Sequence, residues 1–210
     1  MSEPMVLLGG LGMPESPRWH EGRLWFCNWI DRQVVAVGLD GTPEVMLERD
    51  PDSYPMGWSV DWLPDGRLLT TGAKLERQEP DGLLITLAGQ PANEIVVDAC
   101  GNIYINGADF DFVGGGAPKP GYIKLVTPGW QLRQVAGDIQ LPNGMVITPD
   151  NRTLPLALML GGPDRRTLFI CTVEWRRADG HVANLDRLAN GPRTGEILTL
   201  PVEVPGTGRP

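Results

Sequence analysis

The sequence lacks any cluster of basic residues. Its 18 lysines and arginines are scattered among 26 acidic residues, which gives a formal net charge of −8 over 210 residues. Nucleic acids and anionic membrane surfaces are bound through basic patches, so we expect neither as a partner. No apolar run approaches the roughly 18 residues of a membrane-spanning helix, and the first ten residues lack the basic start of a secretory signal. These absences predict a cytoplasmic protein.

Cysteine and histidine are also scarce. The three cysteines, Cys27, Cys100 and Cys171, stand in separate strand-like runs without a CxxC pair, which argues against a zinc site or a disulfide framework. We expect all three to be buried small apolar residues. The two histidines, His20 and His181, have turn-like or loop-like surroundings and no serine or cysteine partner placed by a motif. We therefore expect both on the surface.

Helical periodicity is missing from every long window, whereas turn residues are abundant, with 27 glycines and 20 prolines. A turn followed by a β-prone run recurs along the chain. The first apolar residue after each turn is Leu24, Leu68, Ile103, Leu154 and Leu168, with spacings of 44, 35, 51 and 14 residues. The longer spacings are typical of a β-propeller, in which each repeat is one small antiparallel sheet. The sequence therefore predicts an all-β fold.

The last spacing, of 14 residues, is too short for one propeller blade. Residues 23–49, 58–88 and 95–135 each contain the strands of a blade, and we predict three complete blades from them. For the fourth we predict a composite of residues 144–154, 156–173 and 196–204, with 174–193 as a polar loop. We treat residues 1–210 as a single incomplete β-propeller domain whose rhythm breaks near 154–160. Exposed edge strands of such a fold would allow self-association.

Three oxygen-bearing side chains stand at similar places in their repeats. Glu15 lies nine residues before Leu24, and Asn93 lies ten before Ile103. Asn143 lies 11 residues before Leu154, in an Asn-Gly pair that by itself is most often only a turn. Carboxylate and amide oxygens suit a hard divalent cation such as Ca²⁺ or Mg²⁺. We therefore predict that the three side chains meet at one mouth of the propeller channel.

Four segments together resemble the senescence-marker-protein (SMP-30)/gluconolactonase family of regucalcin-like lactonases. They are GMPESPRWHEGRLWFCNWIDRQVVAV, ANEIVVDACGNIYING, LPNGMVITPDNRTL and LGGPDRRTLFICT, in that order. The resemblance implies a six-bladed propeller that binds one divalent metal ion (Ca, Mg, Mn or Zn) and hydrolyses sugar lactones. It further implies that Glu15 and Asn143 are metal ligands and that Asn93 binds substrate or lies close to the metal. The arginine that often stands two residues before that asparagine is Pro91 here.

The largest departure from the family pattern is a missing aspartate. In the family, the aspartate ligand, which is also the usual candidate for the general base, belongs to a motif of the fifth blade. That motif has no counterpart in this sequence. The resemblance therefore implies an internal loss of about two blades' worth of chain after Leu154 and leaves the catalytic base unknown. Two functions stay open: a metal-dependent sugar lactone hydrolase impaired by this loss, and an inactive propeller remnant that binds a cation or small ligand.

Overall fold

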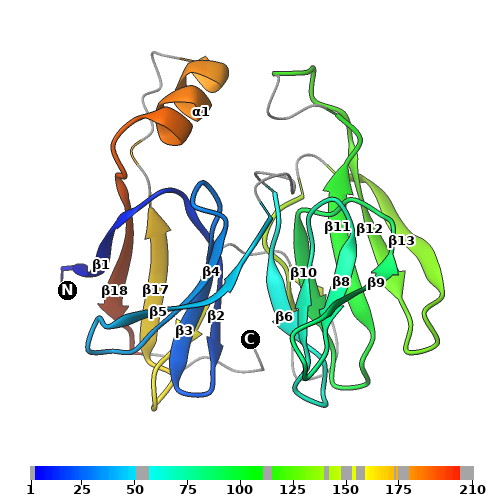
Figure 1. Ribbon diagram of the computed structural model, residues 1–210, viewed down its shortest axis with the longest axis horizontal. Coiled ribbons are helices and arrows are strands. Elements are labelled where there is room, and N and C mark those ends of the chain that lie inside the picture. The colour runs from blue at the N-terminus through cyan, green and yellow to red at the C-terminus, as the bar shows by residue number, and fades with distance from the viewer. Residues whose placement is uncertain are drawn as a thin grey trace.

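A computed structural model describes residues 3–50, 57–110, 115–139, 142–147, 153–154, 159–172, 174 and 180–203. Four antiparallel sheets of four strands each are arranged as the blades of a propeller, with a two-stranded sheet beside them (Figure 1). The predicted all-β propeller with about four blades is confirmed.

The first three blades follow the chain in simple meanders. The first consists of β2 (Pro14–His20), β3 (Arg23–Asn28), β4 (Gln33–Val37) and β5 (Pro43–Glu48). The second consists of β6 (Val60–Trp62), β7 (Leu68–Thr70), β8 (Leu75–Gln78) and β9 (Leu84–Ala88). The third consists of β10 (Glu94–Val97), β11 (Ile103–Ala108), β12 (Gly121–Val126) and β13 (Leu132–Ile139). The strands β2, β6 and β10 are neighbours in space, so the first strand of each blade is the innermost.

The first strand of the first blade is absent from the sequence prediction because it contains two prolines. Proline cannot donate a ladder hydrogen bond and is tolerated in strands only at the first residue, at an edge or at a bulge. Pro14 is the first residue of β2, and the pairing of β2 with β3 shifts register between Glu15 and Arg18, around Pro17. Ser16 adopts a positive φ of 53° within this bulge. The irregular backbone of β2 therefore accommodates both prolines in the innermost strand of the blade.

The fourth blade is not the composite that the sequence predicts. Its strands, from the innermost outward, are β16 (Met159–Gly161), β17 (Thr167–Thr172), β18 (Gly195–Pro201) and β1 (Met5–Leu11). The outer strand thus comes from the N-terminal end of the chain, where β1 pairs antiparallel with β18. Of residues 144–154, the described strands β14 (Val146–Ile147) and β15 (Thr153–Leu154) do not join this sheet but pair with each other. The junction at 155–158 lies outside the described residues.

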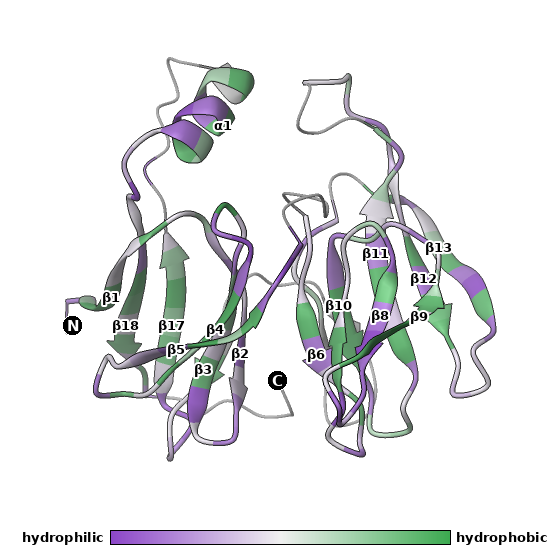
Figure 2. Ribbon diagram, viewed as in Figure 1, coloured by the Kyte–Doolittle hydropathy of each residue, from purple (hydrophilic) through white to green (hydrophobic). Residues whose placement is uncertain are grey.

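The core lies between neighbouring blades. One cluster packs Trp25, Trp29 and Val34 of the first blade against Trp58 and Val60 of the second. Similar apolar clusters join the second blade to the third and the fourth to the first. Burying each large apolar side chain contributes roughly 1.5–3 kcal/mol. Figure 2 shows the matching pattern, in which hydrophobic residues concentrate in the strands.

The segment predicted as a polar loop contains the helix α1 (Gly180–Asn190). Leu185 packs into the cluster between the first two blades, and Leu188 is also buried. After the helix, Arg193 forms an ion pair of 2.7 Å with Asp31 of the first blade. The helix connects β17 to β18 and lies beyond the strand ends in Figure 1. No helix in the described part of the chain is long and apolar enough to cross a membrane.

The cysteine and histidine expectations hold only in part. Cys27 is buried and Cys171 is half-buried, but Cys100 is exposed in a turn, so burial was wrongly predicted for it. His20 is not a freely solvated side chain, because its ring stacks on Trp62 with centroids 3.8 Å apart. Burial accordingly lowers the pKa of His20. The side chain of His181 lies outside the described residues.

Candidate metal and substrate site

The site is built at one end of the innermost strands. Glu15 is the second residue of β2, Asn93 directly precedes β10, and Asn143 lies three residues before β14. The innermost strands β10 and β14 are neighbours, as are β2 and β6, and β6 and β10. The candidate residues therefore lie on or just before innermost strands, with Glu15 in the first blade, Asn93 in the third and Asn143 before the strand next to β10. His20, at the far end of β2, lies away from this mouth.

The two asparagines are in contact. The side-chain N–H of Asn93 donates to Oδ1 of Asn143 across 3.3 Å. Asn93 is half-buried, whereas Asn143 is exposed. Two residues 50 positions apart in sequence thus share one polar contact in the mouth. The amide oxygen of Asn93, the second lone pair of the Asn143 amide oxygen and the remaining amide N–H groups can serve a ligand there.

Glu15 is a carboxylate without a cationic partner among the described residues. Burial raises its pKa to about 7, and the negative charge of Glu94 adds to this, while the N–H of Ser16 opposes it by donating to the carboxylate. Glu15 is thus close enough to interact with Glu94, which follows Asn93 in the sequence. A charged Glu15 is therefore costly at the mouth unless a positive charge arrives.

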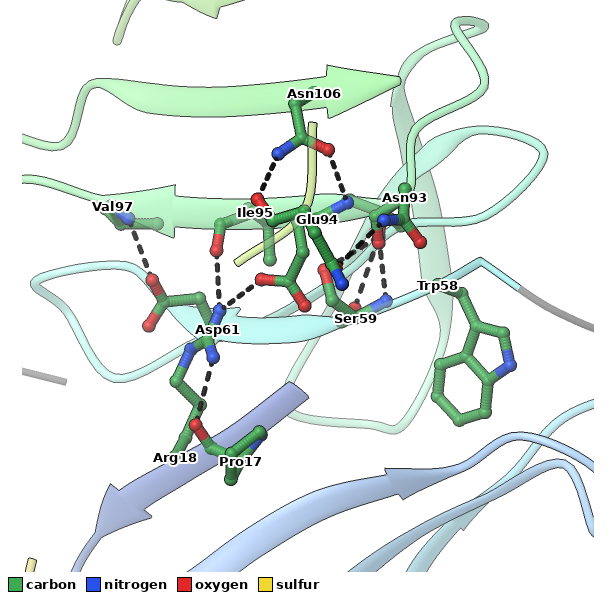
Figure 3. A network of polar contacts seen from close by, with 12 residues as sticks. Pro17, Arg18, Trp58, Ser59, Asp61, Asn93, Glu94, Ile95, Val97 and Asn106 are labelled. Atoms are coloured by element: carbon green, nitrogen blue, oxygen red, sulfur yellow. Dashed lines mark hydrogen bonds and ion pairs between the residues drawn. The ribbon is translucent and has the colours of Figure 1, made fainter. Parts of the chain in front are cut away.

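A buried ion cluster lies next to the mouth. Arg18 of β2 reaches the third blade, where its Nη2 lies 2.9 Å from Glu94 Oε2 and donates to the Ile95 carbonyl across 2.7 Å (Figure 3). Asp61 of β6 lies beside it and accepts from the backbone N–H groups of Trp62 and Val97, each at 2.8 Å. All three charged side chains are buried.

Two shifts in pKa show how these charges act on one another. Burial alone would lower the pKa of the Arg18 guanidinium, but the carboxylates of Glu94 and Asp61 more than reverse this, so the pKa rises. Burial raises the pKa of Asp61 to about 6, although Arg18 and two backbone N–H groups oppose the shift. Among the described residues, Arg18 is thus the cation whose charge offsets the charges of Glu94 and Asp61 in this buried cluster. Neither Arg18, Glu94 nor Asp61 stands out in the sequence as a site residue.

The predicted ligand set is brought together only partly. Asn93 and Asn143 touch, and Glu15 interacts with the residue next to Asn93. Within the described ranges, no three histidine, cysteine, aspartate or glutamate side chains are grouped so that they could hold one metal ion. A cation at this mouth would therefore depend on one carboxylate and on amide oxygens.

Comparison with known proteins gives one family and several similar folds. The profile described as SMP-30/Gluconolactonase/LRE-like region matches residues 13–157. A comparison with curated proteins gives no match. A luciferin-regenerating enzyme has a TM-score of 0.73 at 10% identity, over 99% of this chain and 98% of that one.

Two further solved structures share the architecture. Regucalcin from Agrobacterium tumefaciens, described as a calcium-binding protein, has a TM-score of 0.70 at 16% identity over 99% of this chain and 96% of that one. A gluconolactonase from Xanthomonas campestris has a TM-score of 0.58 at 18% identity, over 91% of this chain and 64% of that one. At such identities the likeness of the structures establishes the fold alone.

Proposed function

Because the chain belongs to the SMP-30/gluconolactonase/LRE-like family, we propose that it hydrolyses sugar lactones with the help of a divalent cation held by Glu15 and Asn143. The observation that carries this proposal is the contact between Asn93 and Asn143, together with the carboxylate of Glu15, which has no described cationic partner and interacts electrostatically with Glu94, the residue after Asn93. Asn93, Asn143 and Glu15 are the three residues that the sequence pattern selects.

The residues present fit a hard cation. Glu15 is half-buried with no positive partner in the described chain, and the hydroxyl of the adjacent Ser16 is buried with no hydrogen-bond partner. Asn93 and Asn143 add amide oxygens, which together with carboxylate are the ligand atoms that Ca²⁺ and Mg²⁺ take. Ca²⁺, Mg²⁺, Mn²⁺ and Zn²⁺ all remain candidates, because nothing in this donor set selects among them.

The roles of the residues follow from their chemistry. A divalent cation at this mouth would supply Lewis-acid polarisation of the lactone carbonyl. Glu15 would provide the charge that holds the cation, and Asn143 would provide an amide oxygen. Asn93 would orient the lactone through its amide group, which can both donate and accept hydrogen bonds.

A second function, cation or small-ligand binding without turnover, is favoured by a different observation. Glu94 is the carboxylate that interacts electrostatically with Glu15, but Arg18 already forms an ion pair with Glu94 at 2.9 Å. Among its described residues the mouth therefore offers a cation one free carboxylate, and divalent sites depend strongly on carboxylate count. This arrangement supports weak binding without turnover.

The decisive assay follows the opening of gluconolactone. We expect a rate above spontaneous hydrolysis that is lost on treatment with EDTA and restored by added Ca²⁺ or Mn²⁺. Wild-type protein inactivated by heat serves as the control for spontaneous opening. A metal-dependent rate supports the hydrolase. Saturable cation binding without any such rate would instead support the binding function.

A further inference from the structure

Asn106 connects the two asparagines of the mouth from behind. It is a fully buried residue of β11, one strand outward from the channel. Its Nδ2 donates to the backbone carbonyl of Asn143 across 2.7 Å, and its Oδ1 accepts from the N–H of Glu94 across 3.3 Å. Its own carbonyl accepts from the N–H of Asn93 at 2.8 Å. One side chain and its backbone thus hold both partners of the Asn93–Asn143 contact.

The second blade has the same device. Thr71 directly follows β7, the second strand of its blade, and is fully buried. Its Oγ1 accepts from the N–H of Ser59 across 2.9 Å, and it donates to the carbonyl of Asn93 across 3.4 Å. Thr71 therefore relates to Asn93 as Asn106 relates to Asn143.

The first blade makes an equivalent bond with a different donor. Trp29 directly follows β3, and its Nε1 donates to the carbonyl of Trp58 across 2.7 Å. Trp58 precedes β6 at the position that corresponds to Asn93 in the next blade. In each of the three blades, a donor from the end of the second strand therefore holds the carbonyl of the next repeat's mouth residue. Trp58 carries no oxygen ligand in its side chain, whereas Asn93 and Asn143 do.

We propose that Asn106 is the positioning residue that sets the Asn143 side chain against Asn93 in the mouth. As a role in cation binding, this rests on the proposed function. Asn143 is exposed and precedes a strand of only two residues, so its own strand supplies little restraint. Its carbonyl is fixed by the Asn106 amide, and the preceding Pro142 lies against Gly121, where an added Cβ would meet its Cδ at 2.5 Å.

Fixing the Asn143 carbonyl restricts the direction of its Cα–Cβ bond, because the carbonyl carbon and Cβ are both bonded to Cα, and the contact with Asn93 then sets the side-chain rotamer. Residues that orient metal ligands from behind typically change metal affinity about 10–100-fold when replaced. The Asn106 amide also keeps the buried N–H of Glu94 paired. Loss of the amide should therefore loosen the mouth at the asparagine pair and leave the first two blades in place.

The test uses three variants of the full chain. Asn106→Leu keeps the size of the side chain and removes both of its hydrogen bonds. Asn106→Thr offers a hydroxyl that can accept and donate, as Thr71 does in the second blade. Trp29→Phe removes the equivalent bond at Trp58 and is the matched control. Measurements are the melting temperature, titration calorimetry with Ca²⁺ and Mn²⁺, and ¹⁵N NMR of the Asn93 and Asn143 side-chain amides.

We expect Asn106→Leu to shift both side-chain amide signals and to weaken cation affinity at least about tenfold. Asn106→Thr should fold and give intermediate changes, and it carries the test if the leucine variant fails to fold. Trp29→Phe should lower the melting temperature and leave the amide signals and the affinity unchanged. Amide signals in Asn106→Leu, or in Asn106→Thr if leucine does not fold, that match those of wild type would overturn the positioning role.

The two readouts separate this inference from the proposed function. Wild-type protein that binds neither Ca²⁺ nor Mn²⁺ contradicts the proposed function, while shifted Asn93 and Asn143 amides in the variants would still establish positioning. Cation affinity that falls in Trp29→Phe as much as in the Asn106 variants would reduce Asn106 to a general structural residue and contradict the inference.

Discussion

Replacing Arg18 with methionine is expected to destabilise the fold by about 3–5 kcal/mol, the typical cost of breaking a buried ion pair by removing one partner. Glu94 and Asp61 would stay buried with no described cation beside them. The carbonyl groups of Pro17 and Ile95, at 3.0 and 2.7 Å from the guanidinium, would also lose their donor. Methionine keeps the apolar stem, so the loss is mainly one of charge and hydrogen bonds.

Thermal and urea unfolding followed by circular dichroism measure this effect. For a chain of this length each kcal/mol corresponds to roughly 2–4 °C, so the melting temperature should fall by about 6–20 °C. Arg23→Met is the matched control, because Arg23 lies on the adjacent strand β3 and pairs with Glu44 at 2.5 Å on the surface. Exposed pairs contribute about 0–1 kcal/mol, so this control should stay close to wild type.

A double variant identifies the cause of the loss. Arg18→Met combined with Glu94→Gln removes the unpaired charge and should recover part of the stability that the single variant loses. A single variant as stable as Arg23→Met would show that the buried cluster is already balanced by protonation. No recovery in the double variant would place the cost in the lost carbonyl contacts instead.

The sequence predicts those parts of the fold that are encoded locally. The hairpins of the first and third blades are marked by turn residues such as Asp40-Gly41, and their strands appear close to the predicted positions. The mouth residues Glu15, Asn93 and Asn143 are also found locally, because each precedes a turn-and-strand unit at a similar distance. The structure confirms the propeller that this rhythm predicts.

The missed features depend on contacts between distant residues. The pairing of β1 with β18 joins the two ends of the chain, and no local pattern in Met5–Leu11 specifies its partner. Arg18 and Glu94 are 76 residues apart, so their ion pair cannot be inferred from either strand alone. A usable signal for Glu94 and Asp61 was the presence of an acidic residue within a short, otherwise apolar inner strand, EIVV and VDW, whereas Arg18 stands in the polar segment PESPRWH.

The helix α1 was missed because its local signals are few. It is only 11 residues long, and its buried apolar side chains among the described residues are two leucines three positions apart, Leu185 and Leu188. The pair Gly191-Pro192 after it is a usable stop signal, since glycine often follows a helix and proline cannot continue one. Packing of the helix on the first blade, which cannot be inferred from the sequence, supplies much of the stability that so short a helix lacks in isolation.

Replacing Glu15 with glutamine is expected to abolish measurable cation binding and to reduce lactone opening to the rate with EDTA. The part of the wild-type site that the structure describes has one free carboxylate, so we expect a dissociation constant for Ca²⁺ of about 10⁻⁴ to 10⁻³ M, within the weak range of protein calcium sites. Glutamine keeps the shape and one oxygen of the side chain but removes its charge. Only neutral amide oxygens then face the divalent cation, and these do not compensate the cation for the loss of its hydration shell.

Titration calorimetry with Ca²⁺ and Mn²⁺, together with the gluconolactone assay, measures both effects. Glu21→Gln is the matched control, because Glu21 follows β2 at the far end from the mouth and its side chain is exposed. It makes the same change in net charge, so it should bind and turn over like wild type. Micromolar or tighter binding by wild type that Glu15→Gln loses would contradict the weak site and favour an efficient enzyme. Equal binding by wild type and Glu15→Gln would mean that the cation lies elsewhere, since the one unpaired carboxylate of the described mouth would then contribute nothing to holding it.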